Sequence, residues 1–140
     1  PGAGTPANLE ELLSRPRRLN IPEQDLINAL AELQTEVRAG YPELPFDFSI
    51  ELDGTALRIE GITQNQKISN FRIDDQPLAE ILTALVLKAN PNPAVTSAKD
   101  PLCKLIWLVD PRQPDGRILV TTRAAAAENG WTLPPQVTPE

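Results

Sequence analysis

The sequence predicts an α+β fold built from two copies of one strand-helix unit. Each copy passes from an extended stretch into helical apolar spacing, and alternating apolar runs elsewhere predict further strands. One unit alone leaves an apolar helix face uncovered, so both copies are expected to share a core. The predicted element order is β-α-β-β-β-α-β-β. Five residues of the first copy recur 52 positions later in the second: Ile21 and Ile73, Gln24 and Gln76, Leu26 and Leu78, Leu30 and Leu82, and Leu33 and Leu85.

Residues 1–18 are predicted to form an N-terminal flank with one short helix. Asn8 is a suitable N-cap, and the acidic residues Glu10 and Glu11 suit the positive end of the helix dipole. Pro16 should end this helix, because proline removes a donor and clashes with the preceding turn. The basic run at 15–18 is interpreted as a solvated linker in preference to a binding patch.

The first repeat copy is predicted as a strand at residues 18–21 followed by a helix at 22–38. Pro22 suits the first helical position, where a missing N–H costs little. Gly40 and Pro42 should end the helix. The spacing i, i+4, i+7, i+11 predicts one apolar stripe on this helix, formed by Leu26, Leu30, Leu33 and Val37.

Residues 46–62 are predicted to form a β-hairpin. Apolar residues alternate with polar ones from Phe46 to Leu52, which is typical of a half-buried strand. Asp53-Gly54 is a common hairpin turn, and Leu57 and Ile59 would lie on the returning strand.

The second copy is predicted as a strand at 67–73 and a helix at 77–89. Asp74 or Asp75 would cap this helix, with Pro77 in its first turn and Asn90 as a left-handed cap at its end. Its apolar face consists of Leu78, Ile81, Leu82, Leu85 and Val86.

Two apolar runs, 105–109 and 118–122, are predicted to pair as a final hairpin, with Asp115-Gly116 in the turn. The remaining segment, 123–140, is predicted as a short alanine-rich helix and a proline-rich tail. Gly130 could cap the helix and Trp131 could dock it.

Residues 19–122 resemble the secretin and TonB short N-terminal (STN) domain. The segment 19–30 is similar to that family's opening strand, its Ile-Pro-x-Gln-x-Leu helix entry and its Ala-Leu helix. The segment 73–82, followed by a terminal hairpin, is similar to the second strand-helix unit and the end of the family's domain.

The resemblance implies a small α+β domain in which two helices are packed between small sheets. It implies a non-catalytic protein-protein interaction module in a bacterial cell-envelope protein, placed in the periplasm or cell envelope. The implied partner is another envelope protein, bound by sheet-edge or groove contact. The resemblance identifies no residue that binds this partner and implies no cofactor.

Charge and hydropathy restrict the partner classes. With 19 acidic against 13 basic residues, the net charge of −6 repels phosphate backbones, so nucleic acid is not an expected partner. No stretch approaches the roughly 20 apolar residues of a membrane-spanning helix. The chain has no methionine, so we expect a processed or trimmed part of a longer protein whose targeting segment is absent.

The residue types argue against catalysis. The chain has no histidine and one cysteine, which removes the commonest general base and a closed zinc site. Cys103 is interpreted as a small buried residue in preference to a nucleophile. The adjacent carboxylates Asp74 and Asp75 are interpreted as capping groups in preference to a catalytic pair. We therefore assign no catalytic, cofactor-binding or metal-binding residue.

Two questions stay open from the sequence. Gln24 and Gln76 would each bond to their own backbone at a helix start, or would touch each other across the pseudo-symmetric core. The second question is the function. The first hypothesis is an interaction module to which a partner protein adds a strand at a sheet edge. The alternative is a small-molecule binding domain, or a weak carboxylate-based hydrolase, with its site in a cleft between the two repeat units.

Overall fold

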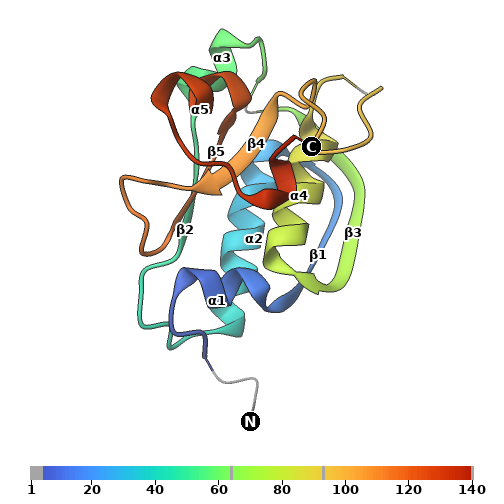
Figure 1. Cartoon of the computed structure of the whole chain (residues 1–140). Coiled ribbons are helices and arrows are strands. Elements are labelled where there is room, and N and C mark those ends of the chain that lie inside the picture. Colours follow the sequence, from blue (N-terminus) through green and yellow to red (C-terminus); the bar gives the residue numbers. More distant parts are fainter. Residues whose placement is uncertain (1–4, 64, 93, 140) are drawn as a thin grey trace.

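A computed structural model describes residues 5–63, 65–92 and 94–139 of the chain (Figure 1). Two long helices, α2 (Leu26–Gly40) and α4 (Leu78–Ala89), lie between two small sheets. The structure therefore confirms the predicted α+β fold. One sheet is a ribbon of β1 (Pro16–Asp25) and β3 (Lys67–Pro77). The other has the strand order β2-β5-β4, with β2 at Ser49–Leu52, β5 at Arg117–Thr122 and β4 at Leu105–Val109.

Shorter helices flank this arrangement. They are α1 (Leu9–Ser14), α3 (Gly54–Ile59), α5 (Arg123–Asn129) and a 3-10 turn at Pro135–Val137. The predicted N-cap of α1 is confirmed, because the Asn8 side chain accepts a hydrogen bond from the Glu11 N–H at 2.9 Å. Gly130 caps α5 in the left-handed conformation, with φ 68°, also as predicted.

The two repeat copies pair with each other through their strands. β1 and β3 are antiparallel, and Asn20 lies opposite Arg72, its own equivalent 52 positions later. Equivalent residues that face each other mark a pseudo-twofold axis through the centre of the ribbon. The two helices leave opposite ends of the ribbon and pack beneath it.

The predicted apolar stripes are confirmed as core. All nine residues named for α2 and α4 are buried, and they belong to one cluster that also includes β4 and β5. The two flanking segments contribute to the same cluster through Leu9, Leu12, Ala126 and Val137. The boundaries at 18 and 122 stay predictions.

The predicted starts of both long helices are wrong, because each strand runs further than expected. Pro22 lies within β1, which continues to Asp25, and α2 begins at Leu26. Ladder pairing skips Pro22, which has no N–H to donate. Pro77 is the last residue of β3, so α4 begins at Leu78. Tertiary pairing of the two strands has overridden the local preference of proline for a first helical turn.

Asp74 and Asp75 do not cap α4, contrary to the prediction. They lie in β3 at a β-bulge, where the register shifts opposite the Arg17–Leu19 segment. Asp75 has φ 59°, a left-handed conformation that Asp and Asn tolerate better than most residues. The end of α4 also differs, since Asn90 has extended backbone angles rather than the expected left-handed ones.

The predicted hairpin at 46–62 is wrong. β2 ends at Leu52, and residues 54–59 form α3 instead of a returning strand. Asp53 caps this helix by accepting a hydrogen bond from the Ala56 N–H at 3.2 Å, since Asp serves equally as a helix N-cap and in a turn. β2 pairs in parallel with β5, with Ser49 beside Arg117. The final hairpin of β4 and β5 is confirmed.

The basic run at 15–18 is not a solvated linker, because it begins β1. Arg17 forms an ion pair with Glu36 on α2, and its guanidinium lies 5.3 Å from the ring centroid of Tyr41. Arg17 therefore fixes the start of β1 against the end of α2.

Gly116 packs against the chain just before β2. A substitution at this position therefore tests how closely β2 and β5 lie beside each other. A Cβ atom at position 116 would lie 2.2 Å from the carbonyl oxygen of Asp47, which is backbone and cannot rotate away. We expect Gly116→Ala to lower the free energy of unfolding by about 1–3 kcal/mol in urea denaturation. The matched control is Gly54→Ala, since no atom lies within 4 Å of a Cβ there. Equal stabilities of the two variants would contradict the contact.

Candidate partner-binding site

The outer edge of β3 carries unpaired backbone groups. The Leu26 N–H donates to the Gln66 carbonyl at 2.8 Å. The backbone N–H and C=O groups at even positions of this ladder therefore point toward the partner strand, and those at odd positions point away from it. The N–H and C=O groups of Lys67, Ser69, Phe71 and Ile73 therefore point away from β1. Within the described ranges, no hydrogen-bond partner contacts them. Lys67 is exposed, Ser69 and Ile73 are half-buried, and Phe71 is buried. β3 runs along the outside of the molecule (Figure 1).

The opposite edge of the ribbon is less open. Along β1 the outward groups belong to residues 19, 21, 23 and 25 by the same alternation. Ile21 is 0% exposed, and the Asp25 N–H donates to its neighbour's side chain, Gln24 Oε1, at 3.2 Å. This edge faces α2, so a partner strand has no continuous row of free groups to pair with.

A polar groove of about 660 Å³ lies between β1 and the exposed face of α2. Small residues of α2, including Ala31 and Ala39, line one wall. Two of the carboxylates in the groove are neutralised by ion pairs, Glu36 with Arg17 and Asp74 with Arg72. In the part of the chain that the structure describes, the remaining two charged lining residues, Arg18 and Glu32, have no ion pair.

The edge of β2 is closed by two side chains of α2. Gln34 Oε1 accepts a hydrogen bond from the Ile50 N–H at 2.8 Å. Arg38 Nε donates to the Phe48 carbonyl at 2.9 Å. One helical turn separates the two side chains, so together they occupy successive outward groups of the strand. Such cover protects a short edge strand from pairing with another chain.

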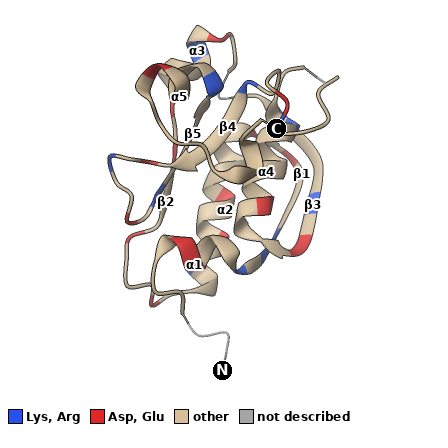
Figure 2. Cartoon of the chain, in the orientation of Figure 1, with Lys and Arg blue, Asp and Glu red and all other residues tan. Residues whose placement is uncertain are grey.

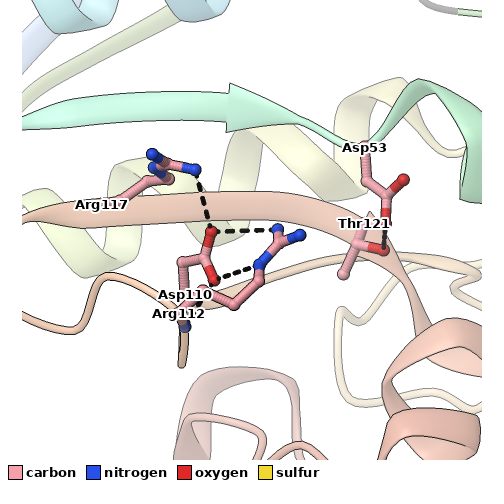
Figure 3. Close-up of polar contacts among 5 residues, drawn as sticks. All are labelled: Asp53, Asp110, Arg112, Arg117 and Thr121. Carbon is pink, nitrogen blue, oxygen red and sulfur yellow. Dashed lines mark hydrogen bonds and ion pairs between the residues drawn. The ribbon is translucent and has the colours of Figure 1, made fainter.

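A buried carboxylate holds the turn between β4 and β5 (Figure 3). Asp110 is 0% exposed and binds Arg112 through two bonds, Nε to Oδ1 at 3.0 Å and Nη2 to Oδ2 at 3.1 Å. Arg117 Nη1 lies 3.5 Å from Oδ2. Burial would raise the pKa of Asp110, but hydrogen bonds from Arg112 and the positive charges of Arg112 and Arg117 lower it below its ordinary value. Both oxygens are occupied, so Asp110 is a structural anion.

Asp53 links β2 to β5 in the same region (Figure 3). Its Oδ2 accepts a hydrogen bond from Thr121 Oγ1 at 3.0 Å, while Oδ1 caps α3. The residue predicted for a hairpin turn therefore stabilises a contact between distant segments.

The remaining candidate residues of the sequence lie apart. Cys103 is 0% exposed, its Sγ lies 3.4 Å from the Leu105 carbonyl oxygen, and burial raises the pKa of the thiol, which agrees with a buried apolar role. Gln24 accepts from the adjacent N–H, as in the first of its two interpretations. Gln76 lies opposite Arg17 and Gln24 opposite Ile68, so the two glutamines do not touch.

Charged residues of both signs are interspersed over the helices and strands in the view of Figure 2. Among the described residues, no group of three His, Cys, Asp or Glu side chains could hold a metal ion. Within the same ranges, each helix is too short or too polar to cross a membrane.

Comparison of the chain with family models, curated proteins and solved structures found no match in any of the three.

The cluster around Asp110 predicts a pH dependence of stability. A carboxyl whose pKa is lower in the folded state stabilises the fold above its unfolded pKa, and this contribution is lost as the pH falls through the folded pKa. Stability should therefore fall as the pH drops below about 4. Asp110→Asn should remove this part of the acid dependence and lower the free energy of unfolding at pH 7 by about 1–3 kcal/mol. Urea denaturation from pH 2 to pH 7 measures both effects.

The control for this prediction is Asp115→Asn, in the exposed part of the same turn. It should stay within about 0.5 kcal/mol of the original chain. An unchanged acid dependence in Asp110→Asn would show that the cluster does not produce it.

The cover on β2 predicts that the double variant Gln34→Ala, Arg38→Ala will self-associate. Removing both side chains frees the Ile50 N–H and the Phe48 carbonyl for a second chain. Sedimentation of the double variant at increasing concentration should show dimers, while Thr35→Ala, on the exposed face of α2, should stay like the original chain. A monomeric double variant would mean that β2 needs no such cover.

Proposed function

We propose that this chain is a non-catalytic interaction module of a bacterial cell-envelope protein, and that it binds an extended segment of another envelope protein along β3. The main support is the outer edge of β3, where the backbone N–H and C=O groups of Lys67, Ser69 and Ile73 have no hydrogen-bond partner among the described residues. An extended peptide added to a sheet edge gains main-chain hydrogen bonds without needing a catalytic or metal group.

The contrast among the edges supports this choice. β2 is covered by side chains of α2, and β1 faces α2 with a buried residue at its centre. The central outward residue of β3, Phe71, is buried as Ile21 is on β1. Among the described residues, however, no side chain hydrogen-bonds to the outward backbone groups of β3, whereas the Asp25 N–H of β1 is engaged by Gln24. β3 is therefore the more open of the two long strands. Its exposed charged residue Lys67 is the type of group that discourages indiscriminate edge pairing.

The resemblance to the STN domain supports the same proposal from the sequence side. The two helices of this chain lie between two small sheets, an arrangement that this resemblance implies. The envelope location and the non-enzymatic role are part of the proposal and rest on the resemblance.

The alternative function has weaker support. A ligand site between the two repeat units would correspond best to the groove beside β1, to which the second unit contributes Asp74. Both Asp74 and Glu36 are engaged in ion pairs there, which leaves Glu32 as the unpaired carboxylate among the described lining residues. A pair of free carboxylates facing a substrate, as hydrolysis requires, is not formed by these residues.

Proline substitutions at outward positions test the proposal. Ser69→Pro and Lys67→Pro each remove one N–H that points away from β1, so the ladder with β1 keeps its hydrogen bonds. Cross-linking in bacterial envelope extracts should capture a protein with the original chain. Capture should fall at least about fivefold with either proline variant, because each loses a main-chain hydrogen bond and the fit of the strand around it. Ser69→Ala and Lys67→Ala, which keep the N–H, are the matched controls.

Thermal unfolding of each variant verifies that the fold is retained. The proposal is wrong if no envelope protein is captured, or if the proline and alanine variants capture a partner equally well.

A further inference from the structure

A second hollow lies at the edge of β4. It has a volume of about 520 Å³ and is bounded by α1, the start of α4, the end of β4 and the C-terminal segment. Apolar side chains form most of its wall: Leu13, Pro77, Ala79, Trp107, Val109 and Pro134. We call it the β4 pocket.

The backbone of Val109 faces this pocket without a partner. The Asp110 N–H donates to the Arg117 carbonyl and the Arg123 N–H to the Lys104 carbonyl, at 2.9 and 2.8 Å. The backbone N–H and C=O groups of even-numbered residues of β4 therefore point toward β5, and those of Val109 point to the outer edge. Val109 is half-buried, and within the described residues no group hydrogen-bonds to its backbone.

The C-terminal segment borders this edge but does not pair with it. It is held at two points: the Trp131 N–H donates to the Ala126 carbonyl at 2.9 Å, and Arg123 Nη1 donates to the Val137 carbonyl at 2.7 Å. Between these anchors lie Pro134 and Pro135, which have no N–H to donate to a strand. The segment therefore forms a wall of the pocket and leaves Val109 free.

Two carboxylates, Glu10 and Glu80, complete the lining of the pocket. Both are exposed, and in the described part of the chain neither has an ion pair. Each lies in the first turn of a helix, α1 and α4, where the helix dipole stabilises a negative charge. The pocket thus combines an apolar wall with two ionised groups and one free backbone edge.

We propose that the β4 pocket binds an extended peptide segment through a lysine or arginine side chain. The methylene stem of such a side chain packs on apolar walls while its charged end stays at a polar rim. Here Leu13 and Val109 provide the wall, and Glu10 and Glu80 receive the cation. The Val109 N–H and C=O hydrogen-bond to the backbone of the same peptide. Pro77 at the end of β3 lies in the wall of the β4 pocket, but Lys67, Ser69 and Ile73 do not, so the site does not depend on the function proposed for the β3 edge.

The charges in the pocket favour a basic occupant over an acidic one. No lysine or arginine is among the lining residues, so an acidic side chain would face Glu10 and Glu80 without a compensating cation. A purely apolar side chain would pack against the apolar wall but would leave the carboxylates of Glu10 and Glu80 without a cation.

Titration with a defined peptide tests this proposal. The probe is a blocked six-residue peptide in which lysine and valine alternate, and the matched probe has glutamate in place of lysine. Backbone amide shifts in NMR spectra should change at Val109 and at residues 10, 13 and 80 with the lysine peptide, and not with the glutamate peptide. The double variant Glu10→Gln, Glu80→Gln should bind the lysine peptide about three- to tenfold more weakly, because two ion pairs at an exposed rim are lost.

Two further variants separate the charge contribution from the backbone contribution. Val109→Pro removes the outward N–H alone and should weaken binding about threefold or more. The double variant Glu43→Gln, Glu128→Gln removes two exposed carboxylates that do not line the pocket, and its affinity should be unchanged. The proposal is overturned if Glu10→Gln, Glu80→Gln binds as tightly as this control, if both peptides bind equally, or if the shifts cluster on β3 or beside β1.

Discussion

The antiparallel pairing of β1 with β3 is the constraint on which the rest of the structure depends. The ribbon is centred on Asn20 and Arg72, which are equivalent in the repeat, so the two copies face each other about one axis. With the strands antiparallel, the helices must begin at opposite ends of the ribbon, at Leu26 and Leu78. Both then return beneath it and bury their apolar stripes in one core. Neither copy could bury its helix without the other.

The two copies nevertheless have different surroundings. Ala31 and Thr35 on α2 are exposed beside a groove, whereas their equivalents on α4, Thr83 and Leu87, are half-buried. Thr83 Oγ1 accepts a hydrogen bond from Trp107 Nε1 at 2.9 Å, and Leu87 packs against the core. The second helix is therefore a buried scaffold for β4, α1 and the C-terminal segment. The first helix keeps an exposed face and uses side chains of it to close β2.

Local sequence patterns predicted what local forces determine. The apolar stripes of both helices, the N-cap Asn8 and the C-cap Gly130 follow from helical spacing and backbone preference, and the structure has all of them. The errors occurred where distant pairing decides the outcome. Pro22 and Pro77 suit a first helical turn, yet the ribbon keeps both in strands. Asp53-Gly54 fits a hairpin as well as a helix cap, and only the pairing of β2 with the remote β5 selects the cap. The free groups of β3 depend on the ladder register, which no motif encodes.

The edges of the sheets show how a small α+β domain with four outer strands limits unwanted pairing. On β2 the cover consists of Gln34 and Arg38. On β4 the neighbouring tail with its two prolines borders the strand and, in the described part of the chain, leaves only the groups beside the pocket, those of Val109, accessible. β1 faces α2, and the outward Asp25 N–H is bonded to the Gln24 side chain. β3 bears only local irregularities, the left-handed residues Asn70 and Asp75, on either side of residues 71–74. Such irregularities twist a strand and restrict which segments can align with it, so an edge that stays open can still be selective.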